Sequence, residues 1–323
     1  MKLSSMSKNE RKLLLILDTN ARASLDEISK KLGISSNEVK LKINEFEKTG
    51  IIKGYHPVLD HSKIGRLSYR ISIKFENLTK VKENEILNYL KSRVNWIVST
   101  LGAWDMILTL YTKDEYEFVN FWNEFYNKFG YYLDRKEILL QIKVYEFEHS
   151  FFSLENSNRN NYFKIEHEPV EVKVDETDLK IIQELTNNAR QDFSDIAKKI
   201  NSSIRIVKYR IKNLEKEKII LGYKTFFDFS DLGLNYYKLI IQLKNINKDN
   251  KKLINEYIIK NPNVVYLIES LGGYDIDFEV NFEELNDNIF RFISDIREKF
   301  PKYIKRIEYV EFIKEHKLTS YNK

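Results

Sequence analysis

An internal repeat constrains this chain more than any other feature of its sequence. Residues 20–55 align without a gap onto residues 188–223, and about sixteen of these thirty-six positions are identical. The likeness continues further along the chain, because residues 101–105 resemble residues 271–275 after a two-residue insertion. The 323-residue chain is therefore predicted to consist of two copies of one unit of roughly 150 residues.

Within the repeat, residues 25–48 carry the pattern of two short helices joined by a tight turn. Apolar residues at i, i+3 and i+7 from Leu25 share one helical face, and Ser24 stands where an N-cap is expected. Gly33 can end this helix in the left-handed conformation, and Ser35, followed three residues later by a glutamate, begins the next helix. Two helices in this arrangement are typical of a helix-turn-helix.

The second helix of such a unit lies in the major groove of DNA, so its outer face is the candidate interface. The second copy has four cations on this face and the first copy has two, so the second copy is predicted to bind DNA phosphates more strongly. Asn37 suits a contact to adenine and Arg205 a contact to guanine. A solvated polar face is the alternative. The candidate DNA-binding residues are Ser36, Asn37, Lys40, Asn44, Lys48, Ser203, Arg205, Lys208, Tyr209 and Lys212.

The distribution of charge agrees with this interpretation. The chain has a formal net charge of +5. Residues 1–55 carry 11 basic and 7 acidic side chains, and residues 175–224 carry 11 and 8, so the positive excess lies in the two helix-turn-helix regions. This is expected of a modest DNA binder. A general bias of the genome towards lysine would also explain part of it.

After each helix-turn-helix the pattern changes to alternation with a period of two. Residues 69–75 alternate as a half-buried strand, and a hairpin with a glycine turn is expected around residue 102. The order of elements is βαββαβ, which predicts a ferredoxin-like sandwich and an α+β fold class. The predicted domains are 1–55 (helix-turn-helix), 56–150 (ferredoxin-like), 151–174 (surface linker), 175–223 (helix-turn-helix) and 224–323 (ferredoxin-like).

Composition excludes several classes of protein. The chain has no cysteine, which rules out disulfides, thiolate metal sites and cysteine nucleophiles. The longest aliphatic run, residues 13–17, is too short to span a membrane. We expect a soluble cytoplasmic protein that does not bind a membrane.

The order of motifs resembles the Lrp/AsnC (feast/famine) transcriptional regulators. The resemblance covers almost the whole chain, twice, and rests on Asn188-Ala189-Arg190, on Ile219-Ile220-x-Gly222-Tyr223 and on Gly272-x-x-Asp275. It implies two winged-helix-like helix-turn-helix domains, each followed by a ferredoxin-like RAM domain. Members of this family typically have one such unit per chain, so this chain is expected to be a covalent pseudo-dimer.

The resemblance also implies partners. It predicts binding to double-stranded DNA, homo-oligomers assembled through the RAM domains, and a small-molecule effector such as an amino acid. A glycine turn beside a carboxylate suits the two charges of an amino acid, although the glycine alone is explained by the hairpin. The candidate effector-binding residues are Gly102, Ala103, Asp105, Gly272, Gly273 and Asp275.

One sheet face in the second copy is acidic, with Asp275, Asp277 and Glu279 on alternate positions. Such carboxylates are usually solvated or paired, and no metal site is predicted. We expect them to meet Arg70 and Lys74, which lie on the corresponding face of the first copy.

A catalytic alternative follows from the same two-domain plan, which some relatives resembling sirohaem decarboxylases share. That chemistry needs histidine and arginine converging on a tetrapyrrole carboxylate. The five histidines are scattered along the sequence, and His56 and His61 are expected on opposite faces of an extended segment. We therefore expect no enzyme, no catalytic residue and no cofactor. A regulator that has lost DNA contact and acts by hetero-oligomerisation is a third alternative.

Overall fold

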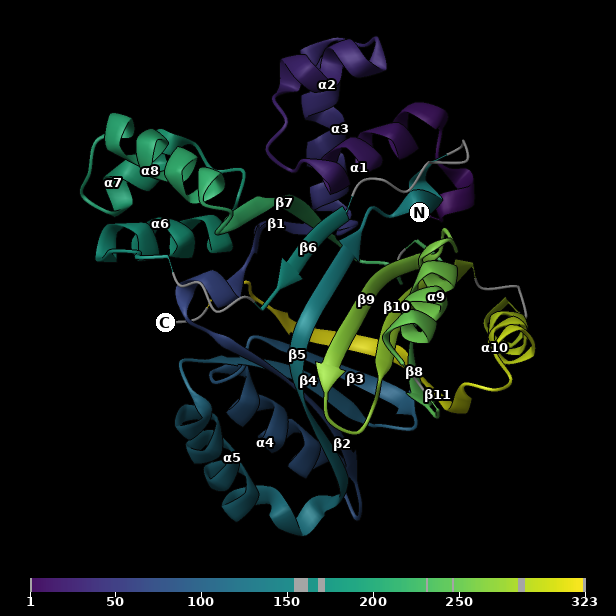
Figure 1. The fold of residues 1–323 in the computed structure, drawn as a ribbon. Coiled ribbons are helices and arrows are strands. Elements are labelled where there is room, and N and C mark those ends of the chain that lie inside the picture. Colours follow the sequence, from purple (N-terminus) through teal and green to yellow (C-terminus); the bar gives the residue numbers. More distant parts are fainter. Residues whose placement is uncertain are drawn as a thin grey trace.

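The computed structural model describes residues 2–153, 162–167, 172–230, 232–245, 247–283 and 288–321. Two helix-turn-helix units lie side by side at one end of the molecule, and the two ferredoxin-like domains lie at the other (Figure 1). Among the described residues, no helix is long and apolar enough to cross a bilayer.

The first helix-turn-helix unit consists of α1 (Lys8–Thr19), α2 (Leu25–Leu32) and α3 (Ser36–Lys48). The predicted caps are confirmed. The side chains of Ser24 and Ser35 accept backbone N–H groups at the starts of α2 and α3, and Gly33 ends α2 with φ +70°.

The second unit repeats this plan with α6 (Glu176–Asn187), α7 (Phe193–Lys199) and α8 (Ile204–Lys216). Asn201 stands where the first copy has Gly33, and it also has a positive φ, of 53°. Asparagine is among the few residues that adopt this conformation readily, which explains why the turn survives without glycine.

The repeated motifs form the contact between the two units. Strand β1 (Ile52–Leu59) pairs antiparallel with β7 (Ile220–Phe227), and His56 lies opposite its repeat equivalent Lys224. The Arg22 guanidinium donates to the Ala189 carbonyl, and in the reciprocal contact Arg190 donates to the carbonyl of Ala21. The two copies are thus related by a pseudo-twofold axis through the β1–β7 ribbon.

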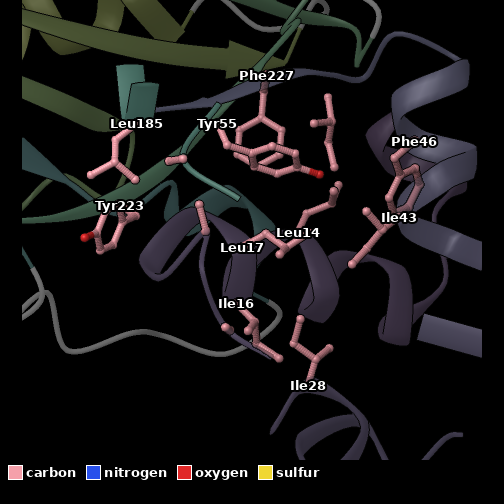
Figure 2. Close-up of a cluster of buried hydrophobic side chains, with 14 of the residues drawn as sticks. Leu14, Ile16, Leu17, Ile28, Ile43, Phe46, Tyr55, Leu185, Tyr223 and Phe227 are labelled. Atoms are coloured by element: carbon pink, nitrogen blue, oxygen red, sulfur yellow. The ribbon is translucent and has the colours of Figure 1, made fainter. Parts of the chain in front are cut away.

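One hydrophobic core joins the two units. Figure 2 shows side chains from α1, α3, β1, α6 and β7 in a single cluster, among them Leu17, Phe46, Tyr55, Tyr223 and Phe227. Because residues of both copies share this core, the two helix-turn-helix units have a common interior rather than two separate ones.

Each ferredoxin-like domain has the strand order expected for that fold. The first sheet has the order β5-β2-β4-β3 and the second the order β11-β8-β10-β9. Alternate residues of β2 behave as predicted, with Ile71 and Ile73 facing the helices while Arg70 and Ser72 lie on the other face of the sheet. The elements are β2 (Leu67–Phe75), α4 (Lys80–Lys91), β3 (Trp96–Gly102), β4 (Met106–Thr112), α5 (Glu115–Phe129), β5 (Leu133–Phe147), β8 (Leu234–Leu243), α9 (Lys248–Ile259), β9 (Val264–Leu271), β10 (Ile276–Glu283), α10 (Asn288–Lys299) and β11 (Ile304–Leu318).

The two sheets are joined at both edges. Strand β3 pairs with β11, and β5 pairs with β9, so that the sheets close into a barrel with helices α4, α5, α9 and α10 on its outside (Figure 1). The faces that carry Arg70 and Glu279 therefore become the inside of the barrel. Barrel closure leaves none of these strand edges open, which also fixes the two copies against each other.

The segment predicted as a surface linker contains a strand that the sequence pattern did not indicate. Strand β6 (Tyr162–Glu166) pairs antiparallel with the end of β5. The remainder of the predicted linker includes residues 154–161 and 168–171, which lie outside the described residues.

Candidate nucleic-acid interface and buried chamber

The outer faces of α3 and α8 are open to solvent. Lys40 and Arg205, at the start of these two helices, are both exposed, as DNA contact requires. Of the ten predicted DNA-binding residues, only Ser36 is partly buried. The others are exposed: Asn37, Lys40, Asn44, Lys48, Ser203, Arg205, Lys208, Tyr209 and Lys212.

The cations on these faces form no ion pairs with any described residue, but Lys208 Nζ lies over the Phe193 ring, 5.6 Å from its centroid. Within the described part of the chain, no ion pair is formed by Lys40, Lys48, Arg205, Lys208 or Lys212. Unpaired cations on an exposed helix are available to phosphate groups. The predicted difference between the two copies therefore remains, since Arg205 and Lys212 of α8 are exposed and form no ion pair among the described residues.

The two serines at the helix starts have structural roles instead. The Ser36 hydroxyl donates to Asp26 Oδ1 at 2.7 Å, and Ser203 Oγ accepts the backbone N–H of Ile206 at 3.2 Å. A serine that caps its own helix has less freedom to contact a base edge. Asn37 and Arg205 are therefore the stronger of the predicted base contacts.

The predicted effector residues lie at the two hairpins, where their carboxylates hold the neighbouring strand. Asp105 accepts the Lys74 ammonium at 2.6 Å and the backbone N–H of Phe75 at 2.8 Å. Asp275 accepts the backbone N–H of Leu243 at 2.7 Å. These hydrogen bonds explain why an aspartate occurs after each glycine turn, whether or not an effector binds.

The hairpin turns lie against the long strand of the other copy. A Cβ atom on Gly102 would lie 2.8 Å from the Tyr309 carbonyl oxygen, and Ala103 donates its N–H to the same oxygen. Side chains at Gly272 and Gly273 would overlap Leu139 and Glu137. The glycines thus permit close packing at the two sheet junctions, and effector binding there stays a prediction.

Inside the barrel, the predicted contact between the copies is confirmed for one residue and wrong for another. Arg70 Nη1 lies 3.7 Å from Glu279 Oε1, and both side chains are almost fully buried. Lys74 instead pairs with Asp105 of its own copy. Lys238, the repeat equivalent of Arg70, neutralises Asp277 at 2.9 Å and Glu279 at 3.3 Å. Lys74 pairs within its own sheet rather than with the second copy because its strand ends next to the hairpin that carries Asp105.

A chamber with a volume of about 190 Å³, partly open to solvent, lies between the β1–β7 ribbon and the mouth of the barrel. We define the chamber by the polar and aromatic residues around it. Among them are His56, His61, Arg66, Ser68, Arg70, Trp96, Tyr111, Gln141, Glu146, His149, His167, Lys224, Phe229, Tyr236, Tyr266, Glu279 and Glu315.

The chamber corrects the expectation that the histidines are scattered. Four of the five line it, namely His56, His61, His149 and His167. His56 and His61 share the chamber because the chain turns into a 3₁₀-helix (His61–Ile64) directly after β1, which an extended segment would not do. Among the described residues, no group of His, Asp or Glu side chains is arranged to hold a metal ion.

Burial keeps the chamber histidines uncharged where a shift is resolved. It lowers the pKa of His61 to about 3, with Arg66 adding to the effect, and it also lowers the pKa of His56. The His61 ring stacks on Tyr111 with centroids 3.6 Å apart. These two imidazoles therefore act as neutral polar groups at physiological pH.

An ionic network connects the chamber to the first helix. Asp18 of α1 is fully buried and bonds His149 Nδ1 at 2.7 Å, and Lys224 Nζ lies 3.3 Å from the same carboxylate oxygen. Lys224 also lies 3.4 Å from Glu146 and donates to the carbonyl of Phe147. Burial alone would raise the pKa of Asp18, but His149 and Lys224 outweigh it and hold that pKa at about 2.

Sequence reasoning missed His149, Lys224, Glu146 and Glu315, because no motif or spacing groups them. The one signal lay in the repeat itself. His56 and Lys224 occupy the same position in the two copies and meet on the pseudo-twofold axis, so a polar pair was to be expected where the axis crosses the ribbon.

Comparison with known proteins supports both the domain plan and the family. A family model for winged helix-turn-helix DNA-binding domains matches residues 6–53 and 174–220. The HTH-type transcriptional regulator LysM of Sulfurisphaera tokodaii is 32% identical over 124 residues, which is 38% of this chain and 85% of that regulator. The HTH-type transcriptional regulator LrpA of Pyrococcus horikoshii is 32% identical over 109 residues, covering 31% of this chain and 77% of that one.

A likeness over the full length is found among solved structures. The crystal structure of the siroheme decarboxylase NirDL has a TM-score of 0.63 and covers 96% of this chain and 92% of its own, at 13% identity. A second structure of that enzyme, in complex with an iron-uroporphyrin III analogue, has a TM-score of 0.62. At this identity the comparison shows a shared fold, in which two helix-turn-helix units and two ferredoxin-like domains are arranged alike.

Proposed function

Because this chain belongs to the Lrp/AsnC-type family of helix-turn-helix regulators, we propose that it is a sequence-specific DNA-binding transcriptional regulator and not an enzyme. The observation that carries the proposal is the exposure of two recognition helices whose outward-facing cations, such as Lys40 and Arg205, form no ion pair among the described residues. Phosphate contacts by such cations supply most of the affinity of DNA-binding proteins.

The covalent link between the copies supports a single chain acting on one operator. The β1–β7 ribbon and the reciprocal arginine contacts hold α3 and α8 in a fixed relation, so both helices would meet DNA together. In related dimers two identical helices read two identical half-sites, since the symmetry of the DNA mirrors that of the protein.

The two half-sites of this chain should differ. Asn37 of the first copy corresponds to Arg205 of the second, and these side chains prefer adenine and guanine respectively. Asn44 corresponds to Lys212, which adds a further cation to α8. We expect an operator without a clean palindrome. Footprinting that returned a perfect palindrome would count against one chain per site.

A salt titration tests the proposal directly. Binding of the protein to a fragment from its own upstream region would be followed by fluorescence anisotropy between low and physiological salt. The double variant Arg205→Ala/Lys208→Ala should flatten the slope of log K against log salt by roughly two, since each phosphate contact contributes about 0.9. The matched control is Lys248→Ala/Lys252→Ala on α9, which removes the same charge far from the recognition helices.

Two outcomes would contradict the proposal. A slope that Arg205→Ala/Lys208→Ala leaves unchanged would remove those residues from the interface. No binding of any genomic fragment at low salt would favour the regulator that acts through hetero-oligomers.

The oligomeric state and the amino-acid effector also belong to this proposal. Light scattering would test assembly through the RAM domains. Calorimetry with the twenty amino acids would test the hairpin residues, and silence for all twenty would favour a purely structural role for them.

The chamber favours a second candidate, an enzyme similar to the siroheme decarboxylases. Four histidines and two arginines converge in a chain whose full-length fold resembles that of NirDL. Decarboxylation replaces a carboxylate by a proton, so it needs a cation to bind the acid and a proton donor beside it.

Absorption spectroscopy separates the two candidates. A shift of the Soret band when sirohaem or haem is mixed with the protein, followed by release of carbon dioxide, would establish the enzyme. An unchanged spectrum at stoichiometric protein would exclude it.

A further inference from the structure

The chamber has the features of a ligand-binding site rather than of a gap left by imperfect packing. It opens partly to solvent, and charged, polar and aromatic side chains of the ribbon and of both sheets surround it. Here the void has a volume of about 190 Å³ and lies where the ribbon and both sheets meet. An engineered apolar cavity of about 150 Å³ holds one benzene molecule, so the chamber has room for a ligand of about ten non-hydrogen atoms.

Most charges around the chamber are already satisfied. Lys224 contacts Asp18, Glu146 and a backbone carbonyl. Glu146 accepts the hydroxyl of Tyr266 at 2.6 Å, and Glu279 accepts that of Tyr236 at 2.6 Å. These groups have little capacity left for a ligand.

Arg70 is the exception. Its side chain is only 8% exposed and its guanidinium lies over the Trp96 ring, 4.5 Å from the centroid. Nε and Nη1 have no hydrogen-bond partner among the described residues, and the 3.7 Å separation from Glu279 is too long for a hydrogen bond. A buried guanidinium without full hydrogen bonding is unfavourable, which indicates that an acceptor of negative charge is missing.

Other polar atoms of the chamber also lack partners. Within the described part of the chain they are Nε2 of Gln141, Nδ1 of His56, Nδ1 of His61 and Oε1 of Glu315. Burial raises the pKa of Glu315 to about 8, against the opposing effect of the Trp96 indole, so this acid is mainly protonated at pH 7 and can donate. Of the cations on the chamber wall, Arg66 pairs with Glu117, and Lys224 pairs with Asp18 and Glu146. Arg70 differs from these two because its Nε and Nη1 have no hydrogen-bond acceptor among the described residues.

The rest of the wall is largely aromatic. Trp96, Tyr111, Tyr236 and Phe229 line the same space, and Tyr111 is backed by the stacked His61 ring. Aromatic walls favour a flat ligand, since rings pack against one another in offset or edge-to-face arrangements.

We propose that the chamber binds a small planar carboxylic acid, about the size of benzoate, whose carboxylate pairs with Arg70 and whose ring contacts the aromatic wall. The carboxylate supplies the acceptor that Nε and Nη1 of Arg70 lack. This site is separate from the hairpins, and its occupancy does not depend on the DNA-binding function proposed above.

Calorimetric titration of the full chain with sodium benzoate tests the proposal, with benzamide as a neutral control of the same shape. Benzoate should bind, and benzamide should bind at least about tenfold more weakly, since a charged hydrogen bond contributes about 1.5–3 kcal/mol. The variant Arg70→Met should lose at least about tenfold in benzoate affinity for the same reason. Arg306→Gln, which removes an exposed cation outside the chamber, should bind as the wild type does.

A second variant keeps the test decisive if Arg70→Met does not fold. Ser68 lines the chamber and is only partly buried, so Ser68→Phe should fill the space while leaving the charges in place. It should abolish benzoate binding. The proposal is overturned if the wild type does not bind benzoate at about 10 mM, a concentration at which even a weak specific site would be largely occupied. It is equally overturned if benzamide binds as well as benzoate, or if Ser68→Phe binds benzoate unchanged.

Discussion

Replacing Glu315 by glutamine should stabilise this protein at neutral pH, because the fold holds the carboxyl in its protonated form. Glu315 lies on β11, and its Oε1 is buried without a hydrogen-bond partner among the described residues. Burial raises its pKa from 4.5 to about 8, and nearby Glu279 acts in the same direction. Glutamine has the shape of the protonated acid and no proton to lose.

The sign and magnitude follow from the two pKa values. A carboxyl whose pKa is higher in the folded state binds its proton more tightly there, so the free energy of unfolding falls as pH rises from 4.5 to 8. Each pH unit contributes about 1.4 kcal/mol, so at pH 7 the acid costs up to about 3 kcal/mol relative to a neutral side chain. Glu315 keeps some solvent exposure, and we therefore expect a measured gain of about 1–3 kcal/mol for Glu315→Gln.

Urea unfolding at a series of pH values measures this gain. All three tryptophans, Trp96, Trp104 and Trp122, belong to the barrel and its helices, so their fluorescence reports on the part that contains Glu315. Wild type and Glu315→Gln should have equal stability near pH 4 and diverge steadily up to pH 8, whereas the exposed Glu298→Gln should follow the wild type. Parallel curves for wild type and Glu315→Gln, or a less stable variant at pH 7, would refute the reasoning.

Two further predictions follow from buried positions. Asp18→Asn should lower the free energy of unfolding by about 3–5 kcal/mol at pH 7, since it leaves Lys224 with one fewer partner in a buried ionic network. The pKa of Asp18 is lowered to about 2, so the wild type should lose this contribution as pH falls from about 4 towards 2, and equal stability of both proteins at pH 7 would contradict it. Gly272→Ala should lower Tm by several degrees, because φ is +139° and a Cβ would overlap Leu139. Gly54→Ala should leave Tm nearly unchanged, since no atom lies within 4 Å of its Cβ position, and equal shifts for the two variants would contradict this account.

Local structure followed from the sequence wherever near neighbours decide it. The strand predicted at residues 69–75 lies within β2, and the hairpin predicted around residue 102 joins β3 to β4. Helix caps such as Ser35 were found because a cap depends on three or four consecutive residues. The internal repeat then supplied the order of the domains and the pseudo-dimer, since two like units were expected to pair as separate subunits do.

The pairing of Arg70 with Glu279 could be predicted for the same reason. Alternation placed each side chain on the face of its strand that the helices do not cover, and the repeat placed those two faces opposite each other. The same alternation predicted that Lys74 would also meet an acid of the second copy. In the structure Lys74 lies near the hairpin and pairs with Asp105 of its own copy. Arg70 and Lys74 differ in which residues lie opposite them, and this depends on the register between strands. The alternation of polar and apolar residues along one strand does not predict that register.

By itself, therefore, the sequence determined a duplicated helix-turn-helix and ferredoxin-like plan, its helices and strands, and the exposed basic faces of α3 and α8. Tertiary structure alone decided the closure of the barrel and the chamber beneath the ribbon. His61 and His149 come together there with Lys224 because a turn follows β1 and because β5 runs back towards the helix-turn-helix units. Such convergence depends on chain reversals and strand register between residues far apart, and those are settled only when the whole chain packs.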